Sequence, residues 1–199
     1  VYQFEVIRIS LTNPLNFDVE FDTTPAFTFS AIPDAARYEI YVSQLDSTDR
    51  RKTVGIVIND KFIDAGQALI PGTGLADYES STKLGEGYYR VWVRAFDASG
   101  NAGDWSIGNQ FTVVKPAITG PAFGTRVTID STPTITWTDV GAPTYELWLS
   151  QVSGTDVNGV AITGTRLVTN VFVNSTEYTL PTAIGNGLFR VWVRAVAND

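Results

Sequence analysis

The chain has 199 residues, a formal net charge of −7, and no cysteine, histidine or methionine. Without Cys and His it cannot form disulfides, zinc-thiolate or imidazole metal sites, or the Ser-His and Cys-His pairs of nucleophilic catalysis. The negative charge disfavours sequence-independent binding to nucleic acid or anionic lipid, because phosphates would be repelled. No apolar run approaches the roughly 20 residues needed to cross a membrane. We therefore expect no cofactor, no nucleic-acid partner and no membrane insertion.

The first residues match a segment that lies about a hundred positions later. QFEVIRISLTNP at 3–14 aligns with QFTVVKPAITGP at 110–121, and in the second location this segment closes a repeat. We therefore predict that residues 1–8 are the last strand of a preceding repeat. Because the chain has no initiator Met, we expect it to be a piece of a longer protein.

Residues 9–115 are predicted to form a first repeat of short strands. In YEIYVSQ at 38–44 and in YYRVWVRA at 88–95, successive side chains alternate between an inward and an outward set, which is typical of half-buried strands. Turn clusters such as AIPDAA and ASGNAGD separate the strands, and no helical stripe of useful length is present. This spacing predicts an antiparallel β-sandwich.

Residues 116–199 repeat the same pattern. YELWLSQ at 145–151 matches the strand that begins at Tyr38, and LFRVWVRA at 188–195 matches the strand that begins at Tyr88. The chain ends before any equivalent of residues 110–114, so we predict that the second repeat lacks its last strand.

The two repeats differ in length. Tyr38 aligns with Tyr145, 107 positions later, whereas Tyr78 aligns with Tyr178, 100 positions later. The first repeat therefore carries about seven extra residues between Leu45 and Tyr78. Insertions usually lie in loops, so we expect a loop there.

The order and spacing of these strands resemble fibronectin type III and related immunoglobulin-like modules of large bacterial surface or secreted proteins. In that family the second strand carries an aromatic residue, which looks like Phe29 and Trp137 here. A Tyr-x-Val-x-Val-x-Ala strand follows near the end, and it begins at Tyr89. The resemblance implies an all-β chain of two tandem antiparallel sandwiches joined near residues 115–118. It also implies the tyrosine corner, a hydroxyl-to-backbone hydrogen bond that Tyr89 can make and Phe189 cannot.

The candidate binding surface lies on the strand that carries Arg-x-Trp-x-Arg in both repeats. If the valines of this strand point inward, its Arg and Trp side chains point outward, beside an aromatic residue of the neighbouring strand. We call this set the Arg-Trp face: Tyr41, Arg90, Trp92 and Arg94 in the first repeat, and Trp148, Arg190, Trp192 and Arg194 in the second. The same alternation predicts that Glu39, Ser43, Glu146 and Ser150 also point outward.

The Arg-Trp face has two interpretations. It can bind a protein or glycan partner, because exposed Trp and Arg are enriched at interface hot spots. Alternatively it forms cation-π and salt-bridge contacts that stiffen the sheet, each exposed cation-π contact contributing about 0.5–1 kcal/mol. We favour the second interpretation, because both repeats keep the whole set whereas a binding site needs only one. An unobstructed Trp ring would favour glycan binding, and a ring covered by Arg would favour stiffening.

Other candidate sites are weaker. The loop DASGNAGD at 97–104 offers closely spaced oxygens, but Gly108 stands where the calcium-binding helix-loop-helix pattern has its bidentate Glu. We expect a polar hairpin loop there. Carboxylate pairs such as Asp60 and Asp64 have no predicted cleft in which to act as general acid and base. The sequence therefore predicts no catalytic residue and no metal ligand.

These observations predict a non-catalytic structural or adhesive repeat module, which acts as a stalk or interaction scaffold of an extracellular or cell-surface protein. The alternative is a carbohydrate-binding or accessory module of a secreted polysaccharide-active enzyme, with Trp92 or Trp192 as the stacking platform. The strand at 188–196 should expose an unpaired edge. Because exposed edges recruit strands, we expect strand exchange between chains through residues 2–8.

Overall fold

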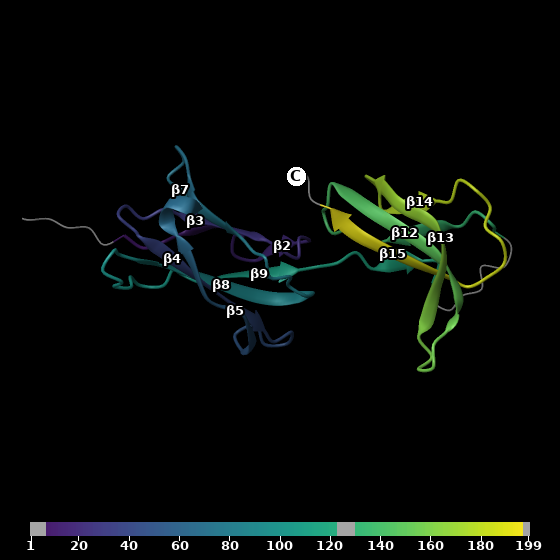
Figure 1. Ribbon diagram of the computed structural model, residues 1–199, viewed down its shortest axis with the longest axis horizontal. Coiled ribbons are helices and arrows are strands. Elements are labelled where there is room, and N and C mark those ends of the chain that lie inside the picture. Colours follow the sequence, from purple (N-terminus) through teal and green to yellow (C-terminus); the bar gives the residue numbers. More distant parts are fainter. Residues whose placement is uncertain (1–6, 123–129, 197–199) are drawn as a thin grey trace, which may run out of the picture. The chain divides into compact units, whose positions relative to one another are not determined.

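The computed structural model describes residues 7–122 and 130–196 and divides the chain into two compact units (Figure 1). Unit 1 spans Val1–Val114 and unit 2 spans Lys115–Asp199. Nearly all of the regular structure is β-strand, and the one helix in the described ranges is the four-residue α1 (Ala65–Ala68). The predicted fold class, two tandem all-β sandwiches, is therefore confirmed.

Unit 1 consists of two sheets. One has the strand order β1-β3-β7-β6 and the other has the order β2-β9-β8-β4-β5. All pairings are antiparallel except that of β2 with β9, which is parallel. The strands are β1 (Leu11–Asn13), β2 (Asp18–Glu20), β3 (Ala26–Ser30), β4 (Arg37–Leu45), β5 (Thr53–Asp64), β6 (Leu69–Ile70), β7 (Leu75–Glu79), β8 (Gly87–Phe96) and β9 (Asn109–Val113).

The core of unit 1 is made by alternate residues of strands from both sheets. Phe27 on β3 and Val91 on β8 belong to one cluster of fully buried side chains. Phe111 on β9 stacks on Tyr89 with ring centroids 5.5 Å apart, and its ring meets that of Phe27 edge-on at 6.0 Å. As the alternation in the sequence predicts, every second residue of these strands faces the core.

Unit 2 repeats this architecture with fewer strands. Its sheets have the orders β10-β11-β14 and β13-β12-β15, and its smaller core includes Ile135, Trp137, Tyr145 and Leu147. Within the described part of unit 2, β15 pairs only with β12 and is therefore an edge strand. The strands are β10 (Ile118–Gly120), β11 (Thr134–Trp137), β12 (Thr144–Thr155), β13 (Ala161–Val173), β14 (Glu177–Thr179) and β15 (Phe189–Val196).

The predicted repeat boundaries receive no direct test. The strand predicted for residues 1–8 falls mostly on residues 1–6, which lie outside the described residues, and residues 7 and 8 have no regular structure. The boundaries 9–115 and 116–199 stay predictions.

The extra residues of the first repeat form more than a loop. Ile63 pairs with Tyr38 as Val173 pairs with Tyr145, so Ile63 and Val173 hold equivalent places. After this point unit 1 forms α1 and β6 before β7, whereas unit 2 passes from β13 to β14 through a short turn. The β12–β13 hairpin of unit 2 is longer than the β4–β5 hairpin of unit 1, which offsets part of the difference in length between the two units. The insertion therefore adds an edge strand to unit 1.

The tyrosine corner is present in unit 1, as predicted. The Tyr89 hydroxyl donates a hydrogen bond to the Gly85 carbonyl oxygen at 2.8 Å. Burial raises the pKa of Tyr89, so the hydroxyl stays a protonated donor at neutral pH. Phe189 has no hydroxyl with which to make this bond in unit 2.

Replacing Tyr89 by Phe should lower the free energy of unfolding of unit 1 by about 1 kcal/mol, because a buried hydrogen bond is lost while the ring stays in place. Urea unfolding combined with amide hydrogen exchange in β8 measures this change. Tyr88→Phe is the control, since no hydrogen bond among the described residues involves the Tyr88 hydroxyl, and its stability should match the parent. Equal losses for the two variants would contradict the assignment.

Candidate interaction surface

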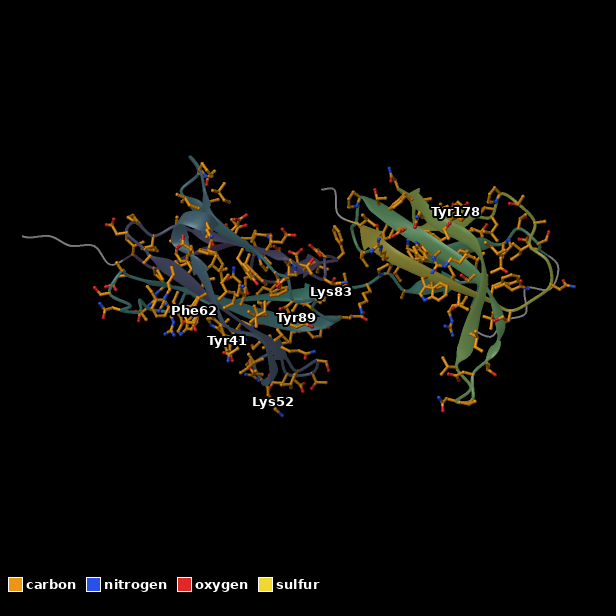
Figure 2. All side chains as sticks on the ribbon, viewed as in Figure 1. Tyr41, Lys52, Phe62, Lys83, Tyr89 and Tyr178 are labelled. Carbon is orange, nitrogen blue, oxygen red and sulfur yellow. The ribbon has the colours of Figure 1, made fainter. Side chains whose placement is uncertain are left out.

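The Arg-Trp face is assembled by one pair of strands in each unit. β4 and β8 form it in unit 1, where Tyr41 lies on the side of the sheet away from β3 and β7 (Figure 2). β12 and β15 form it in unit 2. The opposed pairs are Glu39 with Arg94, Tyr41 with Trp92, and Ser43 with Arg90 in unit 1, and Glu146 with Arg194, Trp148 with Trp192, and Ser150 with Arg190 in unit 2. Each unit therefore brings its four predicted residues together.

The prediction that this whole face points into solvent is wrong at its acidic and hydroxyl positions. Glu39 and Ser43 are 2% and 0% exposed, and Glu146 and Ser150 are 3% and 2% exposed. These side chains stand on the inner strands β4 and β12, each of which has a neighbouring strand on both sides. The face is therefore a polar layer with buried groups at its base.

A part-buried ion pair lies at one end of this layer. The Arg94 Nε atom donates to Glu39 Oε2 at 2.5 Å, and the Arg94 guanidinium lies 4.4 Å from the ring centroid of Trp105. Arg194 and Glu146 form the same pair in unit 2, although the Arg194 side chain is 75% exposed there. A buried carboxylate without a partner is strongly destabilising. The first role of these arginines is therefore to pair with the buried glutamate of their own sheet.

In unit 1 the segment between β8 and β9 covers the face. Ser106 N donates to the Val93 carbonyl oxygen at 2.8 Å, and Val93 N donates to Ser106 Oγ at 3.0 Å, which fixes the segment along β8. This places Trp105 beside the ion pair. Gly108 lies directly against Trp92, since a Cβ atom at Gly108 would be 2.5 Å from the indole Nε1. Trp92 is therefore closed in on this side.

Within the described part of unit 2, no corresponding segment covers the face. Trp192 is 41% exposed, and the guanidinium carbon of Arg190 lies 5.7 Å from its ring centroid. Trp148 is more constrained, because its Nε1 donates to Glu146 Oε1 at 2.8 Å and Arg166 lies 4.5 Å from its ring centroid. The two copies of one sequence motif thus have different accessibility.

Sequence reasoning missed several members of the face. Trp105 carried a usable signal, because it stands just before the last strand of the repeat in GDWSIGN. Arg166 carried none, since its place over the sheet depends on the irregular register between β12 and β13. Arg37 was also missed, and its guanidinium carbon lies 4.8 Å from the ring centroid of Phe62 and 4.7 Å from that of Phe96.

The acidic side chains considered as metal or catalytic groups bond to their own loops. Asp97 accepts hydrogen bonds from the Asn101 side chain and from the backbone N–H groups of Asn101 and Ser99, and these bonds lower its pKa. Asp64 caps α1 by accepting from two backbone N–H groups. The side chain of Asp60 lies outside the described residues. In residues 7–122 and 130–196, no three Asp, Glu, His or Cys residues are grouped to hold a metal ion.

A small hollow with an internal volume of about 20 Å³ lies over β9. It is smaller than ligand pockets usually are, which is roughly 300–1,000 Å³. Its lining contains no acidic residue and therefore offers no carboxylate pair for general acid and base catalysis. The residues that line it are Phe17, Arg50, Tyr88, Gln110, Phe111 and Thr112.

Comparison with known proteins gives only distant structural similarity. No family model matches the sequence, and no curated protein is similar to it in sequence. The fibronectin(III)-like modules of Clostridium thermocellum CbhA share 17% identity over 53% of this chain and 94% of theirs, with a TM-score of 0.31. The chicken CNTN1 FN1-FN3 domains share 12% identity over 90% of this chain and 59% of theirs, with a TM-score of 0.30.

An alpha-L-rhamnosidase from Dictyoglumus thermophilum shares 12% identity over 96% of this chain and 25% of its own, with a TM-score of 0.32. The chain thus spans only part of the two larger structures. Similarity at this level carries no argument about the function of the chain, and the fold rests on the strand pairing described above.

Replacing Gly108 by Ala should destabilise unit 1 by about 1–3 kcal/mol, because the added Cβ atom would overlap the Trp92 indole and force it off its site. Thermal unfolding and near-ultraviolet circular dichroism of the indole measure the effect. Gly55→Ala is the matched control, since its Cβ atom would lie 3.9 Å from the nearest neighbour, Gln44 Oε1. An unchanged Gly108→Ala variant would show that Trp92 is not covered by this segment.

Proposed function

We propose that the chain is a non-catalytic structural module of an extracellular or cell-surface protein, of bacterial origin, and that it serves as a stalk or interaction scaffold. The observation that carries the proposal is the closed Arg-Trp face of unit 1. Arg94 is engaged by Glu39 and Trp105, and Trp92 is covered by Gly108. A surface whose charges and rings already contact one another is suited to stiffening a sheet.

The parallel pairing of β2 with β9 supports a load-bearing role. Asp18–Glu20, near the start of unit 1, runs beside Phe111–Val113, at its end. Phe17 N also donates to the Gln110 carbonyl oxygen at 2.6 Å, which extends the pairing. When the two ends of unit 1 are pulled apart, parallel strands slide past each other, so all of these hydrogen bonds are loaded together. Such a pair resists force better than one that opens bond by bond.

The extracellular location rests on composition. An acidic chain without Cys, His or Met is in keeping with an exported bacterial protein. Among the described helices, none has the length and apolar character needed to span a membrane.

One observation favours carbohydrate binding as a second candidate function, in which the chain is an accessory module of a secreted polysaccharide-active enzyme. Trp192 is 41% exposed, and an accessible indole face is what stacking on a sugar ring requires. This function would replace the scaffold proposal if a soluble polysaccharide changed the fluorescence of the chain and Trp192→Ala removed the change. Trp148→Ala is the control, because Arg166 lies over the Trp148 ring.

Glu20→Pro should lower the force at which unit 1 unfolds when the chain is stretched between cysteines introduced at its two ends. Proline has no N–H to donate to a neighbouring strand, and the Glu20 backbone faces β9, since its carbonyl oxygen accepts from Val114 N at 2.9 Å. Val19→Pro is the matched control on the same strand β2, since successive residues of a strand direct their N–H groups to opposite edges and the Val19 N–H points away from β9. Single-molecule force spectroscopy gives both values, and an equal loss of force in the two variants would overturn the load-bearing role.

A further inference from the structure

The segment that covers the Arg-Trp face of unit 1 reaches only part of that face. Gly108 lies against Trp92, and from Asn109 onward the chain continues as β9, which pairs with β8 instead of lying over it. The end of the face that carries Tyr88 and Arg90 is therefore not under this segment.

Strand register identifies the side chains at this open end. Ile56 of β5 lies opposite Ser43 of β4, which lies opposite Arg90 of β8. Directly opposed residues point to the same side of a sheet, so these three side chains form a row across the outer face. The next row, about 7 Å away along the strands, contains Tyr88, Thr112 and Val19.

Two arginines at this end have no carboxylate partner among the described residues. Arg90 Nη2 donates to the Arg50 carbonyl oxygen at 3.2 Å, and the Arg50 guanidinium carbon lies 4.0 Å from the ring centroid of Tyr88. The ion pairs of the described ranges include neither arginine, whereas Arg94 pairs with Glu39. Two guanidinium groups therefore stand over adjacent rows without a counter-ion.

A buried hydroxyl beside these arginines also lacks a partner. Ser43 is fully buried, and no group in the described part of the chain forms a hydrogen bond with its Oγ atom. A buried polar group without a partner destabilises the sheet. A carboxylate bound by Arg90 would bring acceptor oxygens to the side of the sheet on which Ser43 stands.

The local charge at this end is opposite to that of the whole chain. The carboxylates of the β4–β5 turn are occupied, since one accepts hydrogen bonds from backbone N–H groups of the turn and the other pairs with a neighbouring arginine. At physiological salt, charges more than about 8 Å away are largely screened. Four cations against two carboxylates leave a local charge of +2 from Arg50, Arg51, Lys52 and Arg90 with Asp46 and Asp49.

Exposed apolar side chains border the arginines. Ile56 lies on one side and Val19 on the other, and both are exposed. Phe17, which lines the hollow over β9 together with Arg50, is exposed as well. Its φ of 73° is left-handed, a conformation that bulky residues rarely adopt, and a hydrogen bond from Phe17 N to the Gln110 carbonyl oxygen holds it there. Strained residues of this kind concentrate at binding sites.

We propose that this end of the face docks an acidic segment of another protein, in which Asp or Glu side chains alternate with apolar ones. The docking surface consists of Phe17, Val19, Arg50, Ile56 and Arg90. The two guanidinium groups bind carboxylates, because charge-assisted hydrogen bonds of this type are the strong ones. The three apolar side chains cover the apolar residues of the partner.

The side chains favour a protein partner over an acidic polysaccharide. Ile56 and Val19 are aliphatic, so they pack against apolar side chains but offer no flat ring on which a sugar stacks. The Tyr88 ring already has Arg50 over it. This surface lies in unit 1, apart from the exposed Trp192 of unit 2, and binding to it does not depend on the load-bearing role of β2 and β9.

Isothermal titration calorimetry of the full chain with a random copolymer of glutamate and tyrosine tests the docking. The copolymer should bind, and polygalacturonate, which carries carboxylates on a sugar backbone, should bind about tenfold more weakly because it lacks the apolar side chains. A copolymer that does not bind would overturn the proposal. Equal or tighter binding of polygalacturonate would overturn the choice of a protein partner.

Substitutions locate the binding surface. Arg90→Gln should weaken copolymer binding about tenfold, because a charge-assisted hydrogen bond is lost. Arg8→Gln is the matched control, since it removes the same charge from an arginine that pairs with Asp104, and binding should stay within about twofold of the parent. Equal losses in the two variants would mean that only the overall charge matters, which would overturn the site.

Phe17→Gly separates binding from folding. Glycine adopts a φ of 73° without strain, so the variant should unfold at the temperature of the parent and yet bind the copolymer more weakly. Unchanged affinity would remove Phe17 from the surface. If sedimentation velocity shows that the parent chain alone forms dimers, and Arg90→Gln dissociates them, the occupant is a second copy of this chain and the assignment to another protein is wrong.

Discussion

The pairing of β8 with the segment that follows it, residues 102–113, is the interaction on which the rest of unit 1 depends. The segment contacts β8 along its length, from the bridge between Phe96 and Ala102 to the pairing of Gly87 with Val113. It places Phe111 in the core, covers Trp92 with Gly108, and brings β9 beside β2. One segment thus completes the core, closes the polar face and joins the two ends of the unit.

The same requirement explains why two nearly identical strands behave differently. β8 and β15 share the sequence Arg-Val-Trp-Val-Arg, and in each strand the second arginine forms an ion pair with a buried glutamate. Trp92 is enclosed, but Trp192 is exposed. The accessibility of this motif is therefore set by the neighbouring segment. The proposed scaffold role rests on the closed copy, and the alternative of carbohydrate binding rests on the exposed Trp192 of the other copy.

The sequence predicted the features that depend on local alternation. The fold class and the inward valines follow from a period of two and from the turn clusters between the strands, and the hydroxyl bond of Tyr89 was implied by the resemblance to fibronectin type III modules. The eight residues of the Arg-Trp face were also placed on the correct side of their strands. The alternation of side chains did not predict that Glu39 and Ser43 are buried. It shows which side of the sheet a residue lies on, but it does not show what covers that side. Contacts such as Arg166 over Trp148 depend on strand irregularities that have no sequence signal.

Amide hydrogen exchange along β8 and β15 tests the central role of the closing segment most directly. If the segment is what completes each unit, the amides of β8 should be protected throughout. In β15, alternate amides, those that face the open edge, should exchange as fast as amides in a loop. Uniform protection of β15 would contradict this account, because it would mean that another strand already occupies the edge.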